Sequence, residues 1–259
     1  MIEFSEAQLL SWLGQFLWPF FRIGGMLMVA PLFASSFIPV PIRLLLALSL
    51  SAAIVPMLPP PPVDVIPFSG IGLFIGVQQL IIGMAAGFVL QLVFDAIVVG
   101  FQTVAMSMGL GFAVMVDSQR GQQVPMLSQF HFIIAILLFL AMDGHLMMIG
   151  LMIDSFEQLP VGVGGLDAEA FRQIAAWGTH MFAGALRVAL PAATAILLVN
   201  LSIGVISRAA PTLNLFAVGF PITMLTGYLV MMVSLPMLDF SLRILLEKAW
   251  SSIFALWGG

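Results

Sequence analysis

The stretch that decides the fold runs from Met106 to Phe130 and reads MSMGLGFAVMVDSQRGQQVPMLSQF. In it, Gly109 and Gly111 precede the densest polar run in the middle of the chain, residues 117–123, and a proline follows. Glycine loosens a helix and proline lacks an N–H, so this backbone cannot continue as a helix in hydrocarbon. We therefore expect irregular backbone here, covered by protein or lining a wet cavity, with the rest of the chain as its scaffold.

The composition of the whole chain excludes a soluble globular domain. Of the 259 residues, 61% are hydrophobic and only 8% are charged, with a mean hydropathy of +1.16, whereas soluble domains carry about 25% charged residues. The net charge of -4 rests on few groups, and no basic patch is large enough to bind nucleic acid. The absence of cysteine excludes disulfides, thiolate metal sites and cysteine nucleophiles. The composition predicts an integral membrane or membrane-assembled protein.

Long apolar runs on both sides of the central stretch predict an all-α membrane protein. A spanning helix needs about 20 apolar residues. Six runs qualify, which are Leu9–Ala34, Ile38–Leu58, Phe68–Phe94, Phe130–Ile153, Met181–Ile206 and Leu213–Leu238. A seventh piece, Ala96–Val116, contains Gln102, Ser107 and both central glycines. We expect this piece to be a helix that leads into a re-entrant loop.

Methionines gather at the expected loop. Met106, Met108, Met115 and Met126 cluster around the central stretch, which also holds Leu110 and Phe112. Methionine is flexible and polarizable, so such side chains could seal a pore and still yield to a passing polypeptide. Ordinary packing is the alternative, because the chain holds 18 methionines.

The few charged residues in the loop and the apolar runs each need a partner, since an unpaired charge is costly there. Asp117 and Arg120 are three residues apart, close enough to neutralise each other if the loop makes a helical turn. The alternative is that one of them pairs with another subunit and holds the loop closed. Arg22, Arg187 and Asp95 lie in or at the edge of apolar runs, and the sequence does not identify their partners.

Asp143, Gly144 and His145 lie inside one apolar run and look like a fragment of a proton relay. Residues two apart on a helix do not face each other, so Asp143 and His145 cannot form a dyad without partners from other helices. The geometry favours a hydrogen-bonded buried pair, or a helix interrupted at Gly144.

Glycines at regular steps mark one face of the third run. Gly72, Gly76, Gly83 and Gly87 recur at steps of four, seven and four, so two small-xxx-small pairs share a helical face. Such a face lets another backbone approach closely. Packing within the chain and packing on a partner subunit both remain open.

The sequence Ser207–Asn214 separates the last two apolar runs and predicts a helical hairpin. Pro211 sets the turn, Asn214 can cap the next helix, and Arg208 lies just before the turn. We expect these three residues at a helix-packing or subunit interface. The longest polar connection, Asp154–Arg172, is the best internal boundary.

Two motifs, GQQVPMLSQF at residues 121–130 and RAAPTLNLFAVGFP at residues 208–221, together with the aliphatic run around residues 91–96, resemble the FliR family, a bacterial flagellar export-gate subunit. The resemblance runs over essentially the whole chain. The related T-type subunits of virulence injectisomes share the same plan.

The resemblance implies a loop that plugs a central export channel, carried over onto residues 106–122. It implies a P-type-like helical part, residues 1–172, followed by a Q-type-like hairpin and tail, residues 173–259. It implies as partners the P-type and Q-type gate subunits (FliP and FliQ), the B-type switch protein (FlhB) and unfolded flagellar export substrates. The expected location is the flagellar basal body in the bacterial inner membrane, in contact with lipid and raised towards the periplasm.

No catalytic constellation is present in the sequence, so we expect no enzyme activity, no cofactor and no bound metal. Two alternatives to the gate remain. One is a secondary transporter or ion channel acting alone, with Asp143, His145, Arg187 and the stretch Gly109–Gly111 as its site. The other is an assembly scaffold of the same complex that has no gating role.

Overall fold

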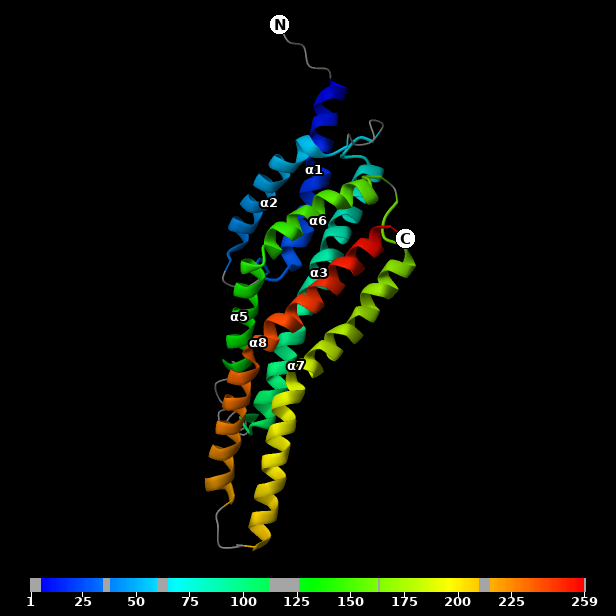
Figure 1. Cartoon of the computed structure of the whole chain (residues 1–259). Helices are drawn as coiled ribbons and strands as arrows, with labels where there is room; N and C mark the ends of the chain where they lie inside the picture. The colour runs from blue at the N-terminus through cyan, green and yellow to red at the C-terminus, as the bar shows by residue number, and fades with distance from the viewer. Residues whose placement is uncertain are drawn as a thin grey trace. The chain divides into compact units, whose positions relative to one another are not determined.

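The computed structural model describes residues 6–34, 38–59, 65–111, 126–162, 164–209 and 215–258, and every regular element within them is helical. The all-α prediction is confirmed. In chain order, the elements drawn in Figure 1 are α1 (Glu6–Val29), α2 (Val40–Ile54), the 3-10 turn η1 (Val55–Met57), α3 (Gly70–Ser107), α5 (Met126–Ala141), α6 (Gly144–Gln158), α7 (Ala168–Ala209) and α8 (Leu215–Trp257).

Helix α3 joins two segments that the sequence analysis separates. It runs without a break over 38 residues from Gly70 to Ser107, so the predicted division between Phe94 and Ala96 is wrong. Asp95 keeps its backbone N–H and has an ordinary helix propensity, so one aspartate costs the helix only a few tenths of a kcal/mol, on the order of 0.5. The helix ends instead where the central glycines begin.

The predicted run Phe130–Ile153 is broken in the structure. Helices α5 and α6 meet at a bend of 65°. Asp143 has a φ of 57°, in the left-handed region, and a methyl group at Gly144 would collide with the ring of Phe139. The interruption near Gly144 that the sequence favours is therefore present, because the chain turns at a left-handed residue and a glycine lets the next helix start against an aromatic ring.

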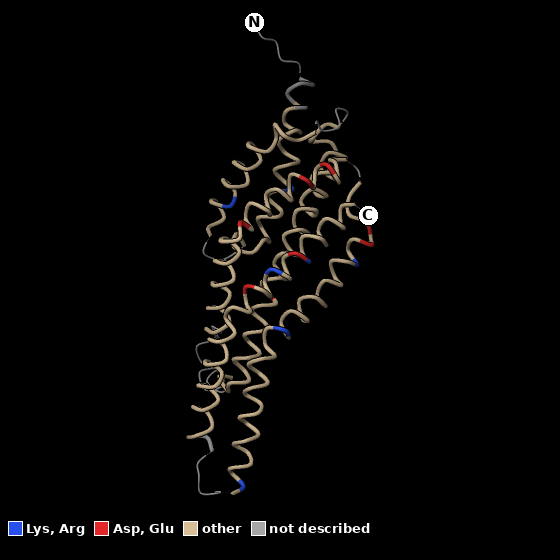
Figure 2. The backbone as a smooth tube through the Cα atoms, viewed as in Figure 1, with Lys and Arg blue, Asp and Glu red and all other residues tan. Residues whose placement is uncertain are grey.

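Among the described residues, four helices are long and apolar enough to cross a membrane, or five if the bent pair α5–α6 forms one span. The sequence analysis expects six. If the bent pair counts as one span, five of the six predicted runs are represented, and the missing run is Leu9–Ala34, because α1 is not among these helices. Figure 2 shows long uncharged stretches of backbone, and α7 carries no charge between Arg187 and Arg208. That stretch is about 30 Å long at 1.5 Å per residue, the thickness of a hydrocarbon core.

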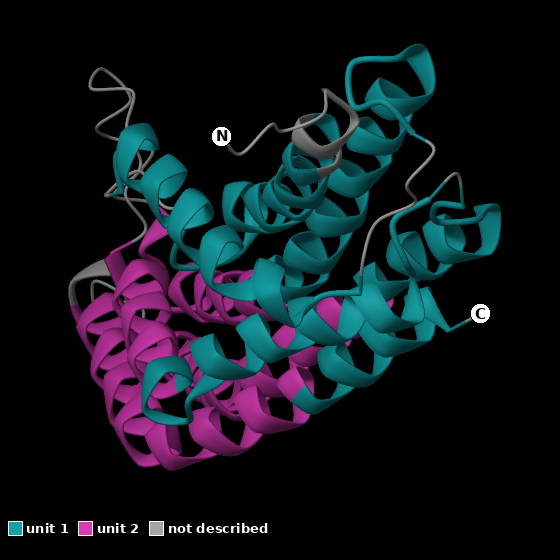
Figure 3. Cartoon of the chain, turned by 90° about the horizontal axis from the view of Figure 1, so that it is seen from above, with its two compact units in different colours: residues 1–92, 139–178, 247–259 teal, residues 93–138, 179–246 magenta. Residues whose placement is uncertain are grey.

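The chain divides into two compact units, each assembled from separate segments (Figure 3). Unit 1 holds residues 1–92, 139–178 and 247–259, and unit 2 holds residues 93–138 and 179–246. Fully buried side chains of unit 1 include Trp18, Met26, Ile82 and Phe156, and those of unit 2 include Phe94, Ile97, Val104 and Ile196. The units reflect packing and do not test the expected division at residue 172, which stays a prediction.

In unit 1, glycines bring α1 and α3 into backbone contact. A methyl group at Gly83 would collide with the carbonyl oxygen of Arg22, and one at Gly87 would lie 2.8 Å from the carbonyl oxygen of Met26. From the other side, a methyl group at Gly25 would lie 3.2 Å from a backbone nitrogen of α3. The absence of side chains at these positions thus sets the separation of the two helices.

Candidate functional site

The end of α3 is closed by a glycine cap at the start of the expected plug. Gly109 has a φ of 85°. Its N–H donates to the carbonyl of Met106 at 3.0 Å, and the N–H of Leu110 donates to the carbonyl of Ala105 at 3.2 Å. These two bonds and the left-handed glycine are the Schellman arrangement, which satisfies carbonyls that the helix end would otherwise leave free.

Met108 anchors this cap on α8. Its side chain is fully buried, and it occupies the space beside Gly227, where an added methyl group would lie 2.6 Å from Cγ and 2.7 Å from Sδ of Met108. The hydroxyl of Thr223, one turn earlier on α8, donates to the carbonyl of Met108 at 3.4 Å. The last turn of α3 therefore has a fixed position within unit 2.

The other described residues of the expected plug are less enclosed. Met106 is 61% exposed, while Leu110 and Gly111 are half-buried. A methyl group at Gly111 would lie 3.0 Å from the sulfur of Met106. Among the described methionines of this region, Met108 packs inward, whereas Met106 and Met126 are exposed. Four predicted plug residues lie outside the described part of the chain: Phe112, Met115, Asp117 and Arg120.

Helix α5, the next described helix after α3, is also fixed against α3. The ring of His131 is buried and stacks on the ring of Phe101, with 3.4 Å between centroids. Its Nδ1 lies 2.8 Å from the carbonyl oxygen of Leu127. The sequence analysis did not single out Phe101, Thr223 or Gly227. Thr223 and Gly227 could have been found from the sequence, because a glycine follows a threonine by one helical turn there.

Arg22 makes several buried hydrogen bonds within unit 1. Its guanidinium is fully buried and donates from Nε to Gln79 Oε1 at 2.7 Å. Further bonds reach the carbonyl of Ser155 at 2.8 Å, the Ser155 hydroxyl at 3.0 Å and the carbonyl of Leu159 at 2.8 Å. The guanidinium carbon also lies 4.0 Å from the ring centroid of Phe156.

The partners of Arg22 explain how a buried cation is tolerated. Both carbonyls lie at the C-terminal end of α6, where helix carbonyls carry partial negative charge, and the carbonyl of Ser155 also accepts a hydrogen bond from the N–H of Leu159. The aromatic ring adds a cation–π contact. Arg22 thereby joins α1, α3 and the end of α6 through neutral acceptors, and the partner that the sequence analysis demands is not a carboxylate.

The other ionisable residues singled out in the sequence are less enclosed. Asp143 is exposed and His145 is half-buried at the break between α5 and α6. The buried Nδ1 of His145 has no hydrogen-bond partner among the described residues. Both belong to unit 1, whereas Arg187, which is exposed, and Asp95, which is half-buried, belong to unit 2.

Most of the glycines predicted to lie at an interface pack against α1 of the same chain. Gly76, Gly83 and Gly87 face α1 of the same chain, and Gly72 faces the backbone of Ile66 and Pro67. Arg208 is exposed in the last turn of α7. Pro211 and Asn214 lie outside the described residues.

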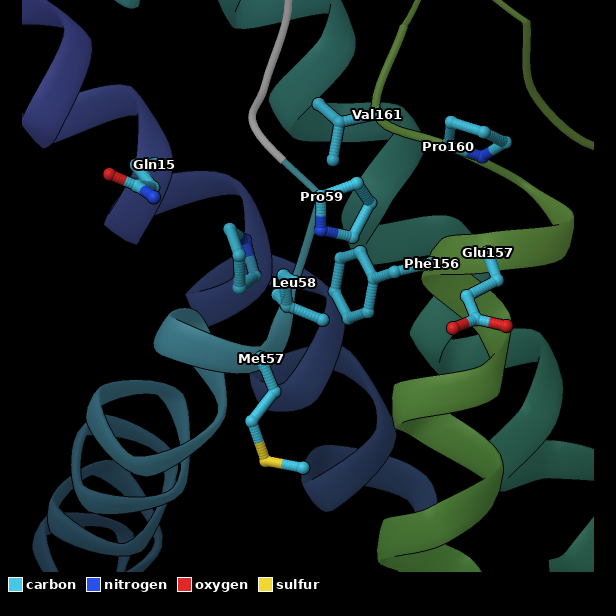
Figure 4. Close-up of a pocket in the computed structure, with 9 residues that line it drawn as sticks. Gln15, Met57, Leu58, Pro59, Phe156, Glu157, Pro160 and Val161 are labelled. Atoms are coloured by element: carbon cyan, nitrogen blue, oxygen red, sulfur yellow. The ribbon is translucent and has the colours of Figure 1, made fainter.

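A pocket of about 470 Å³ opens on unit 1. Gln15 and Pro19 of α1, residues 57–59 and the end of α6 line it, and Figure 4 shows the ring of Phe156 beside Pro59 at its centre. Among the described residues that line it, Glu157 is the one that is charged. Within the described ranges, no group of three or more histidine or acidic residues could hold a metal ion.

Comparison with known proteins assigns the family. The family model described as bacterial export proteins, family 1, matches residues 13–249. The flagellar biosynthetic protein FliR of Escherichia coli (strain K12) is 36% identical over 92% of this chain and 90% of its own length. The protein of that name from Pectobacterium carotovorum shows the same values, and that of Aquifex aeolicus (strain VF5) is 31% identical over 86% of each chain. The resemblance seen in the motifs is confirmed, and the chain belongs to the bacterial export proteins, family 1, alongside these FliR proteins.

Proposed function

We propose that the chain is a subunit of the flagellar export gate in the bacterial inner membrane, where it helps to form and to close the channel for unfolded flagellar proteins. Residues 106–122 would be the plug. The observation that supports this role is the fixed end of α3. In the sequence, the polar residues 117–123 follow closely on a capped helix end whose Met108 is buried against α8.

The uncovered helices support a role within a larger assembly. In the most apolar windows of α2 with η1, and of α7, only 17% of residues are buried inside the chain. These surfaces would contact lipid and partner subunits, namely the P-type and Q-type subunits FliP and FliQ and the B-type protein FlhB. In this proposal the assembly is raised towards the periplasm and the chain is not an enzyme, so the energy for export comes from elsewhere in the apparatus.

The test is a deletion of residues 110–116 in a strain whose own copy is replaced by the variant. We expect the inner membrane to leak ions, because the channel loses its plug, while the variant still copurifies with the other gate subunits in mild detergent. In a strain that also lacks the P-type subunit, the leak should disappear, because no channel is formed.

Other outcomes would identify the alternatives. Copurification without any leak would contradict the plug and leave an assembly scaffold. Ion or solute transport by the purified chain alone in liposomes would instead support a transporter with its own pathway.

A further inference from the structure

The side chain of Met108 occupies a slot on α8 that exists because residue 227 is a glycine. Cγ, Sδ and Cε of Met108 would all lie within 2.9 Å of a methyl group at Gly227, too close for ordinary contact. The whole Met108 side chain is removed from solvent. The thioether therefore fills the volume that any other residue at position 227 would occupy.

The slot is particular to this point of α8. At Gly219, two turns earlier on the same helix, a methyl group would lie 3.6 Å and 3.8 Å from the side chain of Ile203. These are ordinary van der Waals separations, so Gly219 has room for a side chain and Gly227 has none. Gly219 can therefore serve as the control position for substitutions at Gly227.

The contact also lies at the point where the regular helix ends. Met108 directly precedes Gly109, which has the left-handed conformation, and its carbonyl accepts a hydrogen bond from Thr223 at 3.4 Å. The same hydroxyl lies 3.0 Å from the carbonyl of Phe220, so its proton is shared. Side-chain packing is therefore the stronger of the two contacts that hold Met108 on α8.

We propose that Met108 and the Gly227 slot form a latch that fixes the end of α3 in the closed gate. This inference rests on the proposed gate function. Methionine suits a reversible latch because its three side-chain torsions let the thioether leave the slot without breaking a backbone hydrogen bond. Met108 is a positioning residue in this scheme: it holds the end of α3 on α8 and does not itself contact export substrates.

The experiment compares Gly227→Ala with Gly219→Ala in cells that assemble the complete gate. Gly227→Ala should displace Met108 and raise ion leakage several-fold at equal protein abundance, whereas Gly219→Ala should leave leakage at the wild-type level. Met108→Ala, which empties the slot, should leak like Gly227→Ala. It serves as a second variant if Gly227→Ala lowers protein abundance.

A double variant that exchanges the small and the large residue distinguishes a latch from a general loss of stability. Combining Met108→Ala with Gly227→Leu moves the filling side chain from α3 to α8, and it should reduce leakage below that of Met108→Ala alone. A purely structural role would change abundance and leave leakage per assembled gate unchanged, and that result would overturn the latch.

Deletion of residues 110–116 in the same cells shows whether a negative result contradicts the latch alone or the proposed gate function as well. If the deletion leaks and neither Gly227→Ala nor Met108→Ala does, the latch is wrong and the gate stands. If the deletion does not leak, the proposed function itself fails, and the latch fails with it.

Discussion

Replacement of Arg22 by methionine tests how unit 1 is held together. Methionine fills much of the space of the arginine stem but donates no hydrogen bond. Arg22→Met therefore leaves Gln79 Oε1 and the carbonyl of Leu159 without the donor that Arg22 supplies, while the carbonyl of Ser155 keeps its bond from the N–H of Leu159. A hydrogen bond to a charged group contributes about 1.5–3 kcal/mol. The four bonds share one side chain and are not additive, and the acceptors are neutral, so the cost is that of buried acceptors left without a donor, together about 3 kcal/mol. We expect that loss in the free energy of unfolding.

The matched control is Arg43→Met, also in unit 1. Arg43 is half-buried, and its guanidinium donates to the carbonyl of Ile38, five residues earlier in the chain. This local bond should contribute about 1 kcal/mol. Far-UV circular dichroism of the purified protein in mild detergent should therefore show a Tm lower by on the order of 10 °C for Arg22→Met and only a small change for Arg43→Met.

A second readout locates the change at α6. Because the chain has no cysteine, a single Met152→Cys substitution reports on a position that is 1% exposed. In the Arg22→Met background, this thiol should react with maleimide faster than in the Arg43→Met background. Equal Tm values and equal labelling rates in the two backgrounds would refute the view that Arg22 holds the end of α6.

Three further predictions concern single contacts in unit 1, each measured by the same thermal unfolding. Gly25→Ala should destabilise the protein because a methyl group there meets the backbone of α3, whereas Gly24→Ala, with nothing within 4 Å, should be neutral or stabilising by up to about 1 kcal/mol. Asp143→Val should cost about 1–2 kcal/mol because a β-branched residue resists the left-handed conformation, while Asp143→Asn should change little. The Trp177 Nε1–H donates to the Ser252 hydroxyl at 3.2 Å, so Ser252→Ala and Trp177→Phe should each cost about 1 kcal/mol, and the double variant should lose less than their sum.

Apolar length alone predicted the helical class, but it misplaced two helix ends, and the break near Gly144 was favoured only by the spacing of Asp143 and His145. Hydropathy treats residues 94–96 as a boundary, although Asp95 has no effect on backbone geometry and α3 continues through it. It also treats Phe130–Ile153 as one run, although Asp143 takes a positive φ there. Both differences have one cause: helix ends depend on backbone conformation and capping, which mean hydropathy does not measure.

The partners of functional side chains were harder to predict than the side chains themselves. Arg22 stood out in the sequence as a charge in an apolar run, yet its acceptors are an amide, a hydroxyl and carbonyls of α6, far away in sequence. Backbone carbonyls belong to every residue, so no residue type marks them. Gly227 went unnoticed for a related reason: a single glycine in a membrane helix is common, and its importance lies in the side chain that occupies its place.

The two fixed points differ in the kind of interaction that holds them, and this difference bears on which of them can move. Arg22 is held by directional bonds to buried acceptors, so its release would expose several unpaired groups at once and cost their full desolvation. Met108 is held chiefly by shape, and a thioether that leaves its slot exposes apolar surface without leaving a buried polar group unpaired. A gate that opens for each passing polypeptide needs the second kind of contact where it moves and the first kind in its frame. In the proposed gate, the contact between Met108 and Gly227 is therefore the one that can open and close without leaving buried polar groups unpaired, whereas the Arg22 network is not.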